Sequence, residues 1–322
     1  MKVRFWGTRG SLPVAPQPAT IRAKIATALV AASGRSFADE AAACDFIDGE
    51  LDFATGGTYG GATSCVEIEA GGASDAFIVC DLGSGLREFG LNAMARCAAG
   101  HPRTYHVFLS HLHWDHIMGF PFFVPAFDPG AEIVIHSGHP DAEQALRRQQ
   151  EEISFPVAFD WLRAKISFRT LETGVPYAIG AVTVELIEQN HSHRSYGYKF
   201  TDAAGKSCVY STDSEHKIDR MDAESAFVGF FSECDLVICD TMYSLADSIS
   251  MKEDWGHSSN IVAIDLCHEA RARRLALFHH EPTYTDADIQ RMHQESIRYE
   301  ELTREHDPLA VICAYDGLVV DV

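Results

Sequence analysis

"SHLHWDHIMGF", residues 110–120, places His111, His113, Asp115 and His116 within six positions. The stretch follows the apolar run "VFL", which is typical of a strand, so these side chains stand in the turn after a strand, where they can converge. His111 and His113, which are separated by one residue, can reach one ion, whereas Asp115 and His116 point to a second position. Imidazole and carboxylate together suit zinc, manganese or iron. The stretch therefore predicts half of a metal site, which other strand ends must complete.

Short β-rich segments occupy much of the remaining chain. We expect strands at residues 2–6, 65–70, 76–83, 105–111, 131–138, 181–191, 197–202, 207–213 and 235–241, and in "RLALFHHEP". Helical spacing marks residues 85–99, 257–273 and 284–305, with Ser258 or Ser259 as the N-cap of the second. Strands therefore come in two clusters, each followed by helices. This order predicts two sheets packed face to face with helices outside.

An Ala-rich segment at about residues 14–58 interrupts this order and is expected to form two short helices broken at Ser33 and Gly34. No linker or internal repeat divides the chain. We expect a single domain over residues 1–322, with this segment as an insertion that serves as a lid, an interface or a decoration.

Charge and composition limit the classes of partner. The chain has 46 acidic and 26 basic residues, a formal charge of −20, which repels a polyanion such as long nucleic acid. No run of eighteen apolar residues appears, and "MKVRFWGTRG" lacks the apolar core of a signal peptide, so we expect neither a membrane span nor secretion by that route. The nine scattered cysteines are typical of reduced core residues in a cytoplasmic protein.

The pattern H-x-H-x-D-H resembles the signature of the metallo-β-lactamase-fold hydrolases. The resemblance implies an α/β (α+β) fold, an αββα sandwich of two mixed sheets with outer helices, and it implies three further ligands. "QNHSHRSYGYKF" resembles the motif of the next histidine, which favours His191 over His193. "VYSTDSE" contains Asp213 at the place of a bridging carboxylate, and "RLALFHHEP" offers His279, with His280 as the alternative.

By this resemblance two divalent ions, Zn²⁺ or Mn²⁺ with iron also admitted, are held by seven residues. The first ion takes His111, His113 and His191, the second takes Asp115, His116 and His279, and Asp213 is shared. Asp81 and Asp240 resemble carboxylates that orient the imidazoles in relatives, although a strand-end turn explains them equally well.

The stretch "DWGHSSN" resembles the branch that contains tRNase Z, phosphoribosyl 1,2-cyclic phosphate phosphodiesterase and related cyclic nucleotide phosphodiesterases. In that branch the histidine of a Gly-His-Ser motif contacts the phosphate or protonates the leaving oxygen, which implies this role for His257. The helix starting near Ser258 would attract an anion at its N-terminus, so Ser258 is a candidate for substrate contact. "GTRGSLP" and "TYGGATSC" also resemble the branch, so Arg9 and Ser64 are candidates for substrate contact, although tight glycine turns explain both stretches.

These features predict a dinuclear-metal phosphodiesterase that cleaves a small, cyclic phosphodiester. Hydroxide held by the metals attacks phosphorus, with Asp115 and Asp213 at the reacting centre and His257 assisting the leaving oxygen. The alternatives are an ester, lactone or thioester hydrolase on the same metals, tRNA 3′ processing, and a non-catalytic binding protein. Relatives are often dimers, which leaves a homodimer open.

Overall fold

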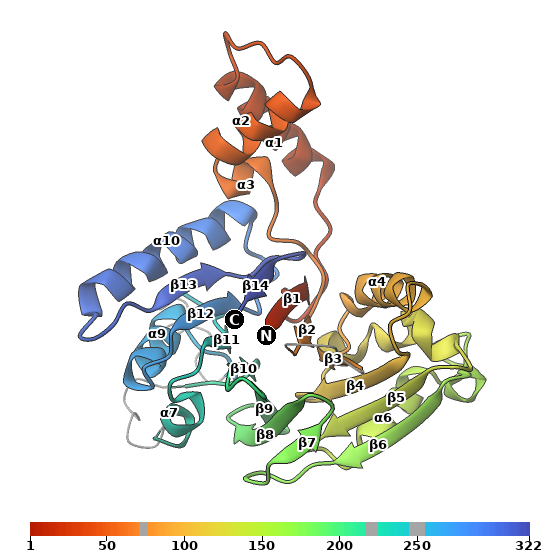
Figure 1. Cartoon of the computed structure of the whole chain (residues 1–322). Coiled ribbons are helices and arrows are strands. Elements are labelled where there is room, and N and C mark those ends of the chain that lie inside the picture. The colour runs from red at the N-terminus through yellow and green to blue at the C-terminus, as the bar shows by residue number, and fades with distance from the viewer. Residues whose placement is uncertain (71–75, 217–224, 245–254) are drawn as a thin grey trace.

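The computed structural model describes residues 1–70, 76–216, 225–244 and 255–322, which form two seven-stranded mixed sheets (Figure 1). The first sheet has the order β14-β1-β2-β3-β4-β5-β6, and the second has the order β13-β12-β11-β10-β9-β8-β7. Strands β3 to β6 pair in parallel, as do β10 to β13. The carboxyl ends of parallel strands share one edge of a sheet, and such edges are the usual place for a site in α/β folds.

The first sheet contains β1 (Lys2–Gly7), β2 (Cys65–Glu69), β3 (Phe77–Cys80), β4 (Thr104–Leu109), β5 (Glu132–Ser137), β6 (Lys165–Thr170) and β14 (Val319–Asp321). The second contains β7 (Tyr177–Ile179), β8 (Val182–Gln189), β9 (Ser195–Asp202), β10 (Ser207–Ser211), β11 (Leu236–Asp240), β12 (Arg274–Phe278) and β13 (Ala310–Cys313).

The helices of the main body are α4 (Leu86–Ala98), α5 (Trp114–Ile117), α6 (Ala142–Gln149), α7 (Ser225–Phe231), α9 (Asn260–Glu269) and α10 (Asp286–Thr303), with 3₁₀ turns η1 (Phe120–Phe122), η2 (Val124–Phe127) and η3 (Phe159–Trp161). Residues of α4 and α6 share an apolar cluster with the first sheet, and residues of α9 and α10 share one with the second. The order of layers is thus helix, sheet, sheet, helix, which confirms the predicted αββα sandwich.

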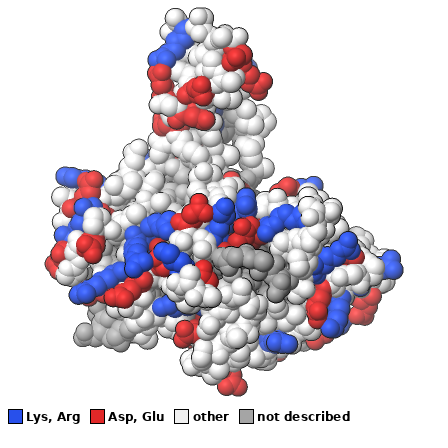
Figure 2. All heavy atoms as spheres, in the orientation of Figure 1, with Lys and Arg blue, Asp and Glu red and all other residues white. Residues whose placement is uncertain are grey.

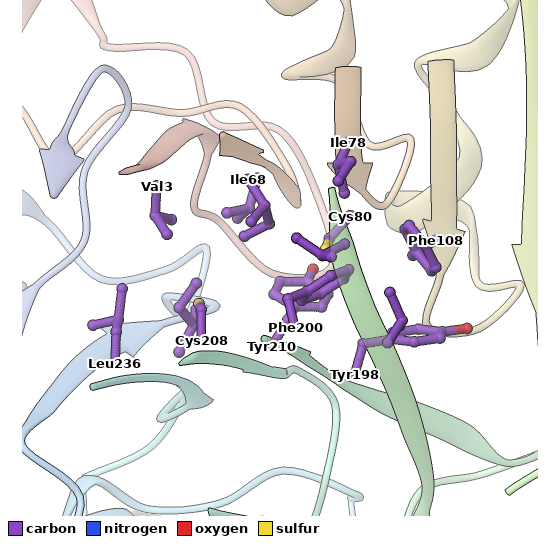
Figure 3. Packing of buried hydrophobic residues seen from close by; sticks show 14 of the residues in the cluster. Val3, Ile68, Ile78, Cys80, Phe108, Tyr198, Phe200, Cys208, Tyr210 and Leu236 are labelled. Carbon is purple, nitrogen blue, oxygen red and sulfur yellow. The ribbon is translucent and has the colours of Figure 1, made fainter. Parts of the chain in front are cut away.

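The space between the sheets is filled by residues that alternate along the strands. Ile78 and Cys80 of β3 pack against the second sheet, near Tyr210 (Figure 3), whereas Phe77 and Val79 of the same strand pack towards α4. Because both faces of the strand are buried, its sequence is apolar at every position instead of alternating. This explains why the predicted strands include continuous apolar runs such as "FIVC".

The structure differs from the sequence-based expectation in two places. Four strands were not predicted, β6, β7, β13 and β14, and all four lie at or next to the sheet edges. Edge strands are partly exposed and often short, so their patterns are weak. The helix expected over residues 257–273 is confined to α9, where the Ser259 side chain caps the start by accepting a hydrogen bond from the backbone N–H of Val262. Arg271, with φ of 52°, lies past its end.

The insertion forms three helices instead of the expected two, α1 (Pro18–Ala31), α2 (Glu40–Glu50) and α3 (Phe53–Gly56). They project from the sandwich beside α10 (Figure 1). Lys24 forms an ion pair with Asp286, and the backbone N–H of Ala54 donates to the Gln290 side chain at 2.8 Å, so the insertion is attached to the first turns of α10.

Among the described residues, no helix combines the length and the apolar character needed to cross a membrane.

Candidate metal centre

The first group of candidate ligands contains His111, His113, His191 and Asp213, whose ligand atoms all lie within 4.8 Å of one another. His111 and His113 follow β4, His191 follows β8, and Asp213 follows β10. Nε2 of His191 lies 3.2 Å from Nδ1 of His113, and Nε2 of His111 lies 3.5 Å from Oδ2 of Asp213. Three strand ends from two sheets thus bring four donors to one point.

The second group contains Asp115, His116, Asp213 and His279. Nε2 of His116 lies 3.1 Å from an oxygen of Asp115 and 3.1 Å from Oδ1 of Asp213. Nε2 of His279 lies 3.2 Å from the same Oδ1 and 3.3 Å from Asp115. Asp213 therefore belongs to both groups, since Oδ2 faces the first and Oδ1 faces the second. This is the placement expected of a bridging carboxylate.

The donors of both groups fit a divalent cation. Nε2 of His111 is buried without a hydrogen-bond partner in the described structure, and Nε2 of His116 faces Nε2 of His279 at 3.3 Å. Burial lowers the pKa of His111 well below its usual range, so the ring stays neutral and keeps a lone pair. Unpartnered buried nitrogens are costly unless a ligand occupies the space between them. The cluster is therefore compatible with a divalent metal site of nitrogen and oxygen ligands.

Three residues of this centre adopt left-handed backbone conformations at strand ends, Asp81 (φ 59°), Asp213 (φ 49°) and His279 (φ 63°). Side chains other than glycine rarely adopt this region, and residues held there concentrate at functional sites. In each case the chain turns sharply just after a strand, which directs the side chain into the space between the two sheets.

Asp81 orients His116. Its carboxylate accepts hydrogen bonds from Nδ1 of His116 at 2.7 Å, from the backbone N–H and the hydroxyl of Ser110 at 2.8 and 2.7 Å, and from the hydroxyl of Tyr210 at 2.7 Å. A histidine held through one ring nitrogen presents the other in a defined direction, here towards the second group. The contact agrees with the orienting role that the sequence suggested for Asp81.

His257 lies between the two groups. Its ring centroid is 5.3 Å from that of His191 and 5.2 Å from that of His279, and its Nδ1–H donates to Asp240 at 2.7 Å. Burial by itself lowers the pKa of His257, but the charge and hydrogen bond of Asp240 outweigh it and raise the pKa to about 9. The neighbouring carbonyl of Gly256 accepts a hydrogen bond from Nδ1 of His191 at 2.8 Å. The Gly-His-Ser segment thus orients one candidate ligand and places an imidazole held by Asp240 beside the centre.

The turn after β1 contributes two residues that sequence reasoning did not single out. The backbone N–H of Ser11 donates to Oδ2 of Asp115 at 2.8 Å. A Cβ atom on Gly10 would lie 2.6 Å from the ring of His279 and 2.3 Å from the side-chain methyl of Met242. "GTRGS" suggests only a tight turn, because nothing local to the stretch reveals which distant side chain approaches its glycine.

We expect Gly10→Ala to weaken the second group selectively, because the added methyl pushes on the His279 ring and shifts the Ser11 N–H away from Asp115. Changes around metal ligands typically cost about 10- to 100-fold in metal affinity, and we expect that loss for one equivalent of metal. Titration of the metal-free protein with Zn²⁺ against a coloured chelator measures it. Gly49→Ala, where the methyl meets open space, is the matched control. Equal loss for all bound metal would contradict the assignment.

The three residues expected to contact substrate are buried. The guanidinium of Arg9 donates to the carbonyls of Gly60, Glu281 and Tyr284 at 2.9–3.1 Å. The hydroxyl of Ser258 donates to the carbonyl of Ser214 at 2.6 Å and accepts from the backbone N–H of His216 at 3.0 Å.

In the described structure these polar groups of Arg9 and Ser258 bond to loop backbone, and their contact with substrate stays a prediction. The Ser64 hydroxyl, also buried, has no partner within the described part of the chain, so it alone of the three keeps a free polar group.

The two competing histidines lie outside the groups. His193 is exposed in the turn after β8. Nε2–H of His280 donates to the carbonyl of Ala314 at 2.8 Å, and its backbone pairs with the turn after β1. The described structure therefore places His191 and His279, the preferred members of each pair, among the candidate ligands.

Comparisons with known proteins agree with this geometry. The model of the β-lactamase superfamily domain matches residues 78–280. Ribonuclease Z of Picrophilus torridus is 21% identical over 231 residues, 57% of this chain and 71% of that protein. Among solved structures, the metallo-β-lactamase-fold protein YhfI from Bacillus subtilis has a TM-score of 0.64 at 18% identity, over 99% of this chain and 98% of that one.

A structure described as a new diphosphatase from the PhnP family has a TM-score of 0.61 at 16% identity, over 100% of this chain and 97% of that one. The family model spans strands from both sheets and includes every residue of the two groups. These matches confirm the family that the H-x-H-x-D-H pattern suggested. The chain therefore belongs to the β-lactamase superfamily, as a metal-dependent hydrolase with the metallo-β-lactamase fold.

Proposed function

We propose that this protein is a phosphodiesterase that hydrolyses a small, cyclic phosphodiester with two divalent ions, zinc or manganese with iron also admitted. The observation that carries the proposal is the position of His257, an imidazole that lies between the two ligand groups and donates to Asp240. An imidazole in this position can present a positive charge to the anionic oxygens of a phosphodiester, a charge that a carboxylic ester, lactone or thioester lacks.

Divalent ions, when bound, supply an activated water molecule and neutralise the oxygens of the phosphate. The residues of the chain supply the rest. His111, His113 and His191 would hold one ion, Asp115, His116 and His279 would hold the other, and Asp213 would serve both groups. Asp115 and Asp213 would thereby fix where the two ions lie relative to the phosphate.

The proton for the leaving oxygen comes from His257. Because Nδ1–H is donated to Asp240, the tautomer and the ring orientation are set, and Nε2 is the nitrogen that can give up a proton. Asp240 in turn accepts a hydrogen bond from the backbone N–H of Met242 at 3.0 Å, which restrains the carboxylate. His257 also offers its positive charge to a phosphate oxygen before the bond breaks.

The test is a comparison of two chromogenic substrates with protein loaded with Zn²⁺ or Mn²⁺. We expect turnover of bis(p-nitrophenyl) phosphate to exceed turnover of p-nitrophenyl acetate, relative to each uncatalysed rate, by at least about 10²-fold, the usual contribution of electrostatic stabilisation of a developing charge. The reverse preference would support the ester hydrolase. A panel of cyclic nucleotides and ribosyl cyclic phosphates then identifies the ring and the base.

Processing of tRNA 3′ ends is the second candidate, because one relative is a ribonuclease Z. Acidic and basic side chains are interspersed on the face shown in Figure 2, and the formal charge of −20 opposes binding of a polyanion. Cleavage of a precursor tRNA that weakens steeply with salt would support this candidate over the small substrate.

The cellular setting and the assembly extend the proposal. All nine cysteines are free and eight of them are buried, which supports a reducing, cytoplasmic location.

The proposed single domain over residues 1–322 includes helix α1, which has no buried residue. The apolar side chains of Ile25 and Leu29 on this helix are exposed. A short helix is only marginally stable in water unless its apolar side chains are packed. We propose that a second copy of the chain covers these side chains. Sedimentation should then show a homodimer, and polar substitutions in α1 should dissociate it.

A further inference from the structure

Trp114 is a large aromatic side chain in an unusual place. It begins α5 between His113 and Asp115, one residue from each ligand group, and 71% of its surface is exposed. The other three residues of that helix, Asp115, His116 and Ile117, are buried. Consecutive Cα atoms are about 3.8 Å apart, so the backbone of Trp114 lies next to one residue of each ligand group. Packing within the fold does not explain an exposed tryptophan at this position.

The indole forms one wall of a cavity of about 910 Å³ that Leu112, Met118, Phe122 and Phe155 also line. Phe122 is 55% exposed and meets Phe155 edge to face, with ring centroids 5.4 Å apart. Pockets for small ligands usually measure about 300–1,000 Å³ and are mainly apolar with a few polar groups. The size and the aromatic walls therefore suit a planar organic group better than a sugar, which requires many hydrogen-bond partners.

Helix α6 forms another wall, and polar groups from the helix and its flanks, including the carboxylates of Asp141 and Glu151, line the cavity. Arg148 lines the cavity and has no ion pair within the described residues, whereas its neighbour Arg147 is paired with Glu143 and Asp160. The Gln149 side chain lines the same cavity and donates to the carbonyl of Ile117 at 3.1 Å, which ties α6 to α5. A free guanidinium can stack on a nucleobase or donate to its edge. The combination of the Trp114 indole and the Arg148 guanidinium therefore suits a purine or pyrimidine.

We propose that this cavity binds the nucleobase of the substrate, stacked on Trp114, so that the phosphodiester is a nucleotide and not a ribosyl or other sugar phosphate. The proposal rests on the proposed phosphodiesterase function, because it takes the phosphate to lie at the ligand groups. It adds a specificity determinant that lies outside those groups.

Calorimetric titration of the metal-loaded protein separates the base from the sugar phosphate without relying on turnover. We expect adenosine 5′-monophosphate to bind about tenfold more tightly than ribose 5-phosphate, because stacking of one base on one aromatic side chain typically contributes about that factor or more. Trp114→Ala should remove this preference and leave ribose 5-phosphate binding unchanged, and Trp114→Phe should keep most of it. Trp161→Ala, also exposed but outside the cavity, should change nothing.

A second pair of variants tests the opposite wall. Arg148→Ala should weaken adenosine 5′-monophosphate several-fold, and Arg147→Ala should not. Equal binding of the two phosphates by the wild type, or an equal loss of both in Trp114→Ala with metal content intact, overturns the proposal. Hydrolysis of bis(p-nitrophenyl) phosphate by the wild type is scored separately. If it fails, the phosphodiesterase function is wrong, while the base preference in the titration still decides the role of Trp114.

Discussion

Replacement of His257 by alanine is expected to slow the hydrolysis of a cyclic nucleotide by about 10²- to 10⁴-fold while the bound metal is retained. His257 lies outside the two groups that share Asp213, and we propose that it contributes a proton and a positive charge at the centre. The oxygen that leaves a cyclic nucleotide is an alkoxide, which must be protonated. The rate of bis(p-nitrophenyl) phosphate hydrolysis should fall much less, since p-nitrophenolate leaves without a proton.

This difference between the two substrates separates the roles of His257. An equal loss on both would show that it binds the phosphate and donates no proton to the leaving oxygen, and no loss on either would refute its part in catalysis. His257→Asn keeps a donor for Asp240 and tests whether the alanine variant merely leaves that carboxylate without its partner. His306, which is exposed on the segment after α10, gives the matched control His306→Ala. Metal content is measured for every variant by atomic absorption.

Asp213→Asn is expected to have the largest effect on metal binding, because Asp213 is the one residue common to both ligand groups. We expect bound zinc to fall from two equivalents to one or fewer, and phosphodiesterase activity to fall by more than about 10³-fold, since several electrostatic contributions of about 10²- to 10³-fold disappear together. Asparagine has the same shape and tolerates the left-handed backbone that Asp213 adopts, so the change tests the charge and not the fold.

Asp160→Asn, at an exposed carboxylate on the surface, controls for loss of an aspartate far from the centre. The melting temperature without added metal should be similar in Asp213→Asn and in the wild type, whereas the stabilisation on adding zinc should shrink, because a ligand stabilises only the state that binds it. Two equivalents of zinc retained in Asp213→Asn would contradict its bridging position.

Several features of the centre could be read from the sequence because they are local. His111, His113, Asp115 and His116 lie in one turn after one strand, and their spacing alone divides them into two half-groups. Most strands of both sheets can be recognised as short apolar runs, because the burial of a strand leaves a local pattern of apolar residues in the sequence. The resemblance to a known family then supplied His191, Asp213, His279 and His257, each at the end of a strand or the start of a helix.

Other features depend on which strand ends meet in space, and no local pattern contains that information. His279 rather than its neighbour His280 enters the second group because the chain turns left-handed at His279, with φ of 63°, while His280 bonds to Ala314. Arg9 and Ser258 match a substrate-contact motif. In the structure, however, Arg9 donates hydrogen bonds to loop carbonyls 51 and 275 positions away in the sequence, and Ser258 donates to a carbonyl 44 positions away.

From the sequence we predicted the fold class, the kinds of candidate metal ligand and their division between two positions, because strand periodicity and ligand spacing are properties of neighbouring residues. Only the tertiary structure decided that Asp213 faces both groups, that Gly10 and Ser11 restrain His279 and Asp115, and that Trp114 opens onto an aromatic cavity. Those relations join residues that are distant in the chain, and they exist only once the two sheets have packed and brought their carboxyl ends together.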